Sequence, residues 1–157
     1  MQLTRRSGTA EGAALASSKG RPVLLATLEA PFDEAAAAFA VDAAVECGQP
    51  LIVANVVEIP LGPLCLSMGY GALDLTGDEG AALAAPAALA HALGVEVERL
   101  RVRSPHPVDA LLELVAERTP GLLVFGPDRS KLGRRRYRKA ARAIRDRVSC
   151  LVFLADP

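Results

Sequence analysis

The segment from Leu122 to Arg147 reads LLVFGPDRSKLGRRRYRKAARAIRDR. It begins as a short apolar run typical of a buried strand, turns at Gly126 and continues as an arginine-rich stretch with helical spacing. A strand, a glycine and a helix start form the usual geometry for binding a phosphate. Such a loop normally uses small residues, because the backbone must approach the anion, whereas this one has Arg and Lys. The segment is therefore consistent with a phosphate site, a nucleic-acid surface or a solvated helix face.

The distribution of charge favours an anionic partner more than the total charge does. The chain carries 18 Lys and Arg and 18 Asp and Glu, so its formal net charge is zero. Residues 128–147 alone hold ten basic residues and two aspartates, a local charge of +8. A basic concentration of this kind supports nonspecific binding to nucleic acid. Tyr137 is the sole aromatic residue there, and its helical spacing predicts the core, so base stacking is poorly supported.

The rest of the chain alternates between apolar runs and helical patterns. Strands are expected at 22–28, 50–60, 95–103, 121–126 and 150–155, and helices at 32–48, 78–93, 104–119 and 132–148. Such alternation predicts one α/β domain over residues 21–157, a parallel sheet covered on both faces by helices with right-handed crossovers. We expect a flexible tail at 1–20 and a glycine-rich loop or lid at 61–80. Ligands in such folds bind beyond the C-terminal ends of strands, here after residues 28, 57 and 126.

Little else in the sequence indicates catalysis, a metal site or a membrane. The cysteines Cys47, Cys65 and Cys150 form no metal-ligand or disulfide spacing, and Cys150 is expected to be an inert core thiol. His91 and His106 have no paired acid or thiol at ligand spacing. The sparse cysteines, with no signal-length apolar stretch and no apolar run of membrane-spanning length, predict a cytoplasmic protein. Because no reactive or metal-ligating residues are paired, we expect that it is not an enzyme and binds no metal.

The order and spacing of these pieces resemble the universal stress protein (UspA-like) family over roughly residues 21–156. The strand, turn and Ala-rich helix VLLATLEAPFDEAAAAFA (23–40) match the family's opening, and LIVANVVEIP (51–60) resembles its second strand. The stretch 94–126 resembles the third strand, third helix and fourth strand, and VSCLVFLA (148–155) resembles the end. The resemblance implies a doubly wound, Rossmann-like sheet of five parallel strands in the order 3-2-1-4-5, of the adenine nucleotide alpha hydrolase type. It also implies homodimers that pair their last strands, here residues 150–155.

The resemblance also implies where an ATP-binding member would hold its nucleotide. Those members carry Asp at the end of the first strand and a Gly-x2-Gly-x9-Gly-Ser/Thr loop after the fourth. Here the acidic position falls on Leu28, with Glu29 beside it, and the first loop glycine is Gly126. The second glycine falls on Arg129, and the final pair falls on Arg138-Lys139 or one residue later. Because Arg disfavours positive φ and close backbone approach, a backbone cradle for a triphosphate is weakened.

The leading hypothesis is a regulatory or stress-response protein that acts by binding and dimerisation, with ATP binding weakened or lost. Any residual anion site would use Gly126 and the side chains of Arg129, Lys131, Arg138 and Lys139. In one alternative, the chain binds ATP or another adenine nucleotide: Thr27 and Leu28 flank the nucleoside, Val56 and Phe125 line it, and Arg129 and Lys139 hold the phosphates. In another, the basic helix 129–147 binds nucleic acid. A third is a pure interaction module, with the final strand as dimer edge.

Overall fold

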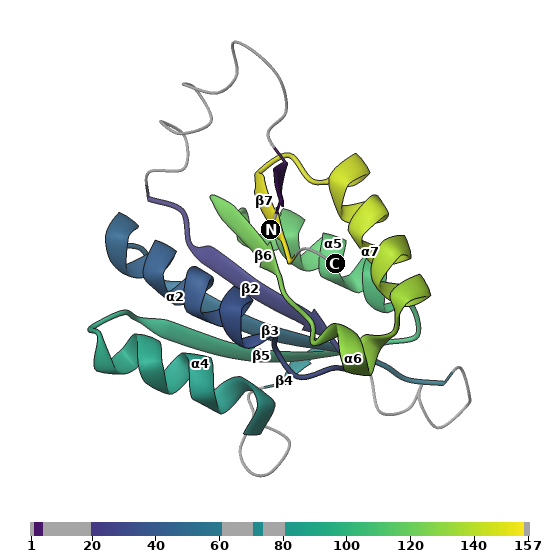
Figure 1. The fold of residues 1–157 in the computed structure, drawn as a ribbon, viewed down its shortest axis with the longest axis horizontal. Helices are drawn as coiled ribbons and strands as arrows, with labels where there is room; N and C mark the ends of the chain where they lie inside the picture. Colours follow the sequence, from purple (N-terminus) through teal and green to yellow (C-terminus); the bar gives the residue numbers. More distant parts are fainter. Residues whose placement is uncertain (1, 5–19, 61–70, 74–80, 156–157) are drawn as a thin grey trace.

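The computed structural model describes residues 2–4, 20–60, 71–73 and 81–155, and within them it places one seven-stranded sheet (Figure 1). Five of the strands are parallel neighbours, and the others pair antiparallel at the two edges. In chain order the strands are β1 (Gln2–Thr4), β2 (Val23–Leu28), β3 (Leu51–Glu58), β4 (Gly71–Leu73), β5 (Val97–Ser104), β6 (Leu122–Phe125) and β7 (Leu151–Leu154). The order across the sheet is β1-β7-β6-β2-β3-β5-β4. The parallel strands thus confirm the predicted 3-2-1-4-5 arrangement.

The two short antiparallel strands were not predicted. Strand β1 pairs with β7 inside the stretch expected to be a tail, and β4 pairs with β5 inside the stretch expected to be a loop. Each has three residues and too little pattern to distinguish it from its surroundings. The remaining parts of the predicted tail and loop, residues 5–19, 61–70 and 74–80, lie outside the described residues.

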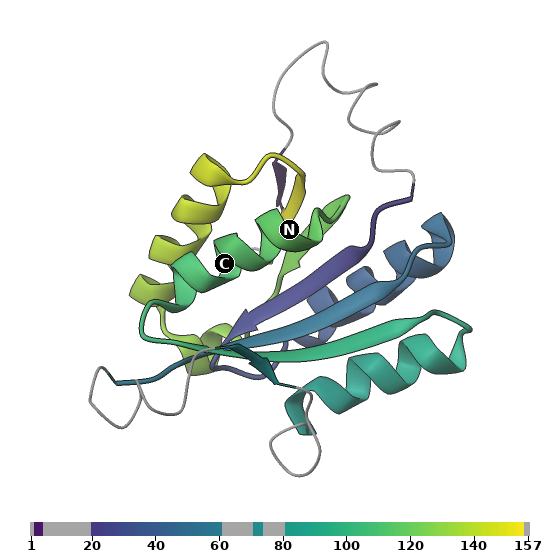
Figure 2. The same ribbon diagram turned by 180° about the vertical axis from the view of Figure 1, so that it is seen from behind.

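Helices cover both faces of the sheet (Figures 1 and 2). The helices are α2 (Glu34–Cys47), α4 (Ala81–Ala92), α5 (Pro107–Arg118), α6 (Arg129–Leu132) and α7 (Arg134–Arg147). Helices α2 and α4 share one apolar core and α5 and α7 share the other. The helix predicted at 132–148 therefore begins at Arg134, and the turn before it forms the separate short helix α6. None of the helices in the described ranges combines the length and apolar character needed to cross a membrane.

Strand β2 shows how the sequence divides between the two cores. Its side chains alternate, so Leu24 and Leu28 enter the core under α5 and α7 while Val23 and Leu25 enter the core under α2 and α4. All six of its residues are buried, which explains why the strand has a continuous apolar sequence without polar alternation. The C-terminal end of β2 therefore lies in the middle of the row of C-terminal strand ends, between the ends of β3 and β6.

Candidate functional site

Two carboxylates and one arginine meet where β2 and β3 end. Glu29 directly follows β2 in the left-handed region (φ 56°), and Glu58 is the last residue of β3. Arg136, in the first turn of α7, donates from Nη1 to Oε2 of Glu29 at 2.7 Å and from Nη2 to Oε2 of Glu58 at 3.0 Å. The other Glu29 oxygen accepts the backbone N–H of Glu58 at 2.9 Å. We call these three side chains the Arg136 clasp; it ties α7 across two neighbouring strand ends.

The Arg136 clasp separates two hollows over the end of β2. Both are lined by Leu28 and Arg136. The larger, of about 340 Å³, extends towards the start of α5 and is also lined by Glu58, Pro105, His106, Pro107, Val108, Asp109, Lys139 and Ala143. The smaller, of about 230 Å³, extends towards α6 and is also lined by Glu29, Ala30, Pro31, Lys131 and Leu132. The switch point predicted from the topology is therefore hollowed, but an ion pair crosses it.

The residues predicted to contact a nucleoside are largely core residues. Thr27, Val56 and Phe125 have no exposed surface, and Leu28 is 3% exposed. The Thr27 hydroxyl donates to the backbone carbonyl of Ala30 at 2.8 Å, and the Phe125 ring stacks on Tyr137 with centroids 5.7 Å apart. Of the four, Leu28 alone lines the hollows described above.

Gly126, predicted as the first glycine of a phosphate loop, packs against a helix. It is buried, and a Cβ built on it would lie 2.4 Å from the Cβ of Ala36 in α2. Contacts that close do not occur between side chains, so only glycine permits α2 to approach β6 as it does. Helix packing alone is therefore sufficient reason for a glycine at this position.

The predicted phosphate-binding cations separate into three groups. The Arg129 guanidinium lies 4.5 Å from the centroid of the Tyr137 ring, a cation–π contact that turns it towards the protein. Lys131 and Lys139 are exposed and line the smaller and the larger hollow, respectively. Arg138 is exposed and lines neither. Because Arg138 and Lys139 lie in the second turn of α7, their backbone N–H groups belong to the helix, and only their side chains are available to an anion.

Asp128 fixes the turn between β6 and the basic helices. Its Oδ1 accepts both the hydroxyl of Ser130 at 2.6 Å and the backbone N–H of Ser130 at 2.9 Å, so it caps α6. These hydrogen bonds, with a smaller contribution from the charge of Lys131, hold the pKa of Asp128 below its ordinary value. The carboxylate is therefore ionised at neutral pH beside the cations.

Arg136 and Glu58 were not predicted as site residues from the sequence, and Glu29 was noted only as the neighbour of the family's acidic position. Arg136 is one of ten cations in a run of twenty residues, and the pattern alone does not show which of them reaches the strand ends. The sequence signal that could have revealed the clasp is the pair of glutamates, because Glu29 follows β2 and Glu58 ends the neighbouring parallel strand β3. Carboxylates in those positions lie at one edge of the sheet and require a shared cation or solvent.

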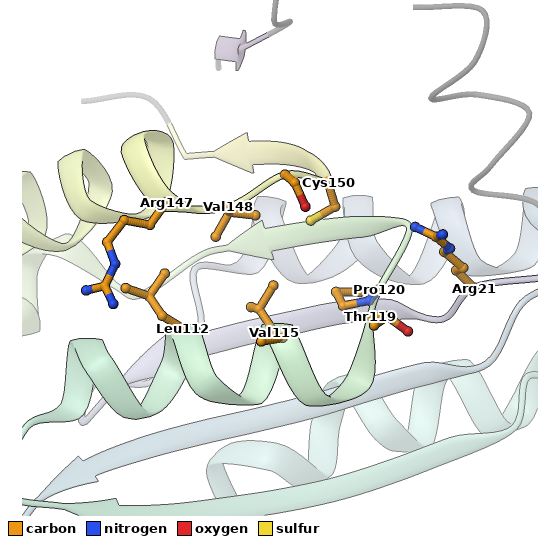
Figure 3. A pocket seen from close by; sticks show the side chains of 10 residues that line it. Arg21, Leu112, Val115, Thr119, Pro120, Arg147, Val148 and Cys150 are labelled. Carbon is orange, nitrogen blue, oxygen red and sulfur yellow. The ribbon is translucent and has the colours of Figure 1, made fainter. Parts of the chain in front are cut away.

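A further hollow, of about 200 Å³, lies at the opposite end of the sheet (Figure 3). Arg147 and Arg21 stand at its two ends, and the apolar side chains of Leu112, Val115 and Val148 lie between them. Cys150, predicted to be a core residue, is only partly buried and also lines this hollow; its burial raises the pKa of its thiol. Arg147 is paired with Asp109 at 2.9 Å.

Other candidate reactive groups are dispersed. Within residues 20–60 and 81–155, no group of three His, Cys, Asp or Glu side chains is arranged to hold a metal ion. Cys47 is exposed with a free thiol, whereas Cys65 lies outside the described residues. Any ligand bound at the strand ends would therefore be recognised by the charged side chains around them.

Comparison with known proteins places this geometry in context. A model of the universal stress protein family matches residues 20–155. The chain is similar to a universal stress protein from Archaeoglobus fulgidus, with 21% identity, coverage of 87% of this chain and 98% of that one, and a TM-score of 0.59. It is also similar to an Archaeoglobus fulgidus universal stress protein in complex with dAMP (19% identity, 88% and 99% coverage, TM-score 0.59). A third similar structure is a universal stress protein in complex with cAMP, with 22% identity, coverage of 87% of this chain and 97% of that one, and a TM-score of 0.56. No match was found among curated proteins.

Proposed function

Because this chain belongs to the universal stress protein family, we propose that it is a cytoplasmic, stress-associated regulatory protein that acts by binding rather than by catalysis. We further propose that its affinity for adenine nucleotides is weakened or lost. The Arg136 clasp carries this proposal, because it spans the strand ends at which ligands of such folds bind.

The charges of the clasp act against a nucleotide. Glu29 and Glu58 would face its phosphates, and the cation between them is already neutralised by two partners. Relatives in complex with dAMP and cAMP show that the fold accepts an adenine nucleotide. In this chain such a ligand would have to displace carboxylates from Arg136, which costs part of its binding energy. The buried Val56 and Phe125 side chains offer it no compensating apolar surface.

Calorimetric titration with ATP, AMP, dAMP and cAMP tests the proposal. We expect no nucleotide to copurify with the wild-type chain and weak or undetectable binding. The double variant E29Q/E58Q removes both negative charges while leaving an amide oxygen to accept the Glu58 backbone N–H, so Arg136 becomes available to a phosphate. We expect it to bind at least about tenfold more tightly than wild type. E98Q is the control: Glu98 forms a comparable surface ion pair with Arg118, and its loss should leave nucleotide affinity unchanged. Stoichiometric copurification of a nucleotide with wild type would overturn the proposal.

The alternative, a nucleotide site rebuilt from cations, is favoured by one observation. Lys131 and Lys139 line the hollows on either side of the clasp, so both cations face the space over the strand ends. If this alternative holds, wild type binds ATP more tightly than AMP, and K131Q/K139Q loses that preference. Under the leading proposal the same variant shows no change, because there is little binding to lose.

We also propose that the protein forms homodimers through residues 150–155. Strand β7 is the last parallel strand, and its outer edge is where a second copy would pair. In the described structure that edge is paired with β1, in the register Gln2 to Leu154 and Thr4 to Val152. A second copy needs the same β7 backbone groups, so it must displace β1. We expect deletion of residues 1–19 to shift the light-scattering mass towards the dimer, whereas an unchanged monomer would contradict dimerisation through β7.

A further inference from the structure

The cations of helix α7 that have no acidic partner among the described residues lie at one end of the helix. Arg136, Arg142 and Arg147 each have an acidic partner within 4 Å. Near the start of the helix, several exposed cations have no such partner among the described residues. They are Lys131 in α6 and Arg134, Arg135, Arg138 and Lys139 in the first two turns of α7, and we call them the free cation cluster. Their charges meet solvent at the edge of the sheet that also holds the Arg136 clasp.

The position of the cluster opposes the helix dipole. The N-terminal turn of a helix favours acidic side chains and a capping side chain. Helix α7 has three arginines in that turn, no acidic residue, and Gly133 as its N-cap residue, without a side-chain cap. Positive charge is therefore concentrated where the backbone N–H groups already make the potential positive. Local helix stability does not explain this arrangement, but an anion bound there would benefit from both sources of potential.

The surface around the cluster selects the kind of anion. The large hydrophobic side chains that the described structure exposes are Val45, Leu89 and Leu93, and none of them is on α7. An interfacial membrane helix requires apolar residues that insert into the lipid, so a bilayer is not the matching partner. The only aromatic residue of α7, Tyr137, is buried and stacked on Phe125, so bases have no platform there.

We propose that the free cation cluster binds the phosphodiester backbone of nucleic acid without sequence preference. Arg134 and Arg138, and likewise Arg135 and Lys139, are four residues apart, so each pair lies along one side of α7 about 6 Å apart on the helix axis. Such rows contact successive phosphates of an extended polyanion. Flexible exposed Arg side chains make charge-assisted contacts to phosphate without a glycine loop. Backbone contacts of this kind position a protein on nucleic acid but do not read its sequence.

The neutral total charge does not oppose this binding, because the charge is segregated. On the opposite face of the sheet, α2 carries Glu34, Asp42 and Glu46 and no basic residue. A polyanion is thus attracted to the α7 side and repelled from the α2 side, and the protein would approach in one orientation. The proposal does not depend on the loss of nucleotide binding, because it uses cations outside the Arg136 clasp.

Fluorescence anisotropy with a labelled RNA single strand and a labelled DNA duplex, each of about 20 units, tests this inference at several salt concentrations between about 50 and 200 mM. We expect weak binding whose log Kd rises with log salt with a slope of about 3 to 4 on duplex DNA, for four or so neutralised phosphates. R134Q/R138Q should weaken binding about tenfold and reduce the slope by about 2. The matched control R21Q/R99Q removes the same charge from exposed arginines elsewhere and should shift Kd less than about twofold.

Three outcomes would overturn the inference. Binding with no dependence on salt excludes backbone contacts. Equal weakening by R134Q/R138Q and R21Q/R99Q assigns the effect to total charge and not to the cluster. Binding to anionic phosphatidylserine vesicles without binding to either nucleic acid assigns the surface to membranes. Thermal melts of both variants followed by circular dichroism verify that each remains folded, so that a loss of binding is attributable to the substituted side chains.

Discussion

Helices α2 and α7 each have 14 residues and pack on opposite faces of one sheet, but their ends are built differently. Helix α2 starts at Asp33, whose side chain accepts the backbone N–H of Ala36 at 2.9 Å, and Glu34 lies in its first turn. It ends at Gly48 in the left-handed conformation. Helix α7 starts after Gly133 without a side-chain cap, has Arg134 in its first turn and ends at Val148 in an extended conformation.

This difference indicates that α2 is stabilised by residues at its own ends, whereas α7 depends on contacts with the rest of the fold. In α2, the cap, the first-turn charge and the terminal glycine agree with one another. In α7 they are missing, and tertiary contacts hold the helix: Tyr137 and Ile144 are buried, the Tyr137 hydroxyl donates to the carbonyl of Ala155, and Arg136 pairs with two strand ends. Departures from local rules concentrate at functional sites, so the start of α7 is where function is to be sought.

The largest effect is expected where α2 packs against β6. Gly126→Ala would place a methyl group 2.4 Å from the Cβ of Ala36, so α2 must shift or the strand must bend. We expect a loss of about 1–3 kcal/mol in the free energy of unfolding, measured by chemical denaturation. The double variant G126A/A36G removes the opposing methyl group and should recover part of that loss. If G126A were as stable as wild type, the packing explanation of this glycine would be wrong.

The next effect tests the cap of α2. Asp33→Ala removes the acceptor for the Ala36 N–H and should lower the free energy of unfolding by about 1 kcal/mol. Asp33→Asn keeps the acceptor and should cost much less, which separates the hydrogen bond from the charge. Asp128→Ala, which removes the side-chain cap of the short helix α6, serves as the comparison near α7. A smaller loss from D33A than from D128A would contradict the view that α2 is the locally specified helix.

Most of the fold could be predicted from the sequence because its strands and helices are long and strongly patterned. The continuous apolar run at β2 and the alternation along the chain predict a parallel sheet, whereas the order of its strands was implied by the resemblance to a known family. Tyr137 was correctly predicted to face the core from its helical spacing. Strands β1 and β4 were missed because three residues contain no period, and their pairing is set by β7 and β5 far away in sequence.

The site was less predictable, because its contacts join residues that are remote in sequence. The Arg136 clasp links positions 29, 58 and 136, and a pattern within one segment does not reveal such a triple. Gly126 was assigned to phosphate binding because a glycine after a strand suits that role, but the same residue satisfies helix packing. The end of the sheet that was predicted to bind ligands is hollowed in the structure, while the contacts of individual side chains could be seen only in the folded arrangement.

A smaller effect should have opposite signs for stability and for binding. Arg134→Glu places an acidic residue in the first turn of α7, where the helix dipole favours it, so the free energy of unfolding should rise by about 0.5 kcal/mol. The same change removes a member of the free cation cluster and should weaken nucleic-acid binding by about tenfold or more. Glu34→Arg in α2 is the mirror control and should lower stability by a similar amount. A fall in stability for R134E would show that Arg134 supports the helix itself.

The smallest effect concerns the pH dependence of the turn before α7. Ser130 hydrogen bonds hold the pKa of Asp128 below its ordinary value of 3.8, so the carboxylate favours the folded state when ionised. That contribution is present above the ordinary pKa and is lost as pH falls through the lower, folded-state pKa. Asp128→Asn should therefore be slightly less stable than wild type at neutral pH, and the difference should shrink below the ordinary pKa and disappear as pH falls through the lower, folded-state pKa. Denaturant midpoints of both proteins across the acid range measure this difference. A gap between D128N and wild type that stays constant with pH would assign the role of Asp128 to its shape and not to its charge.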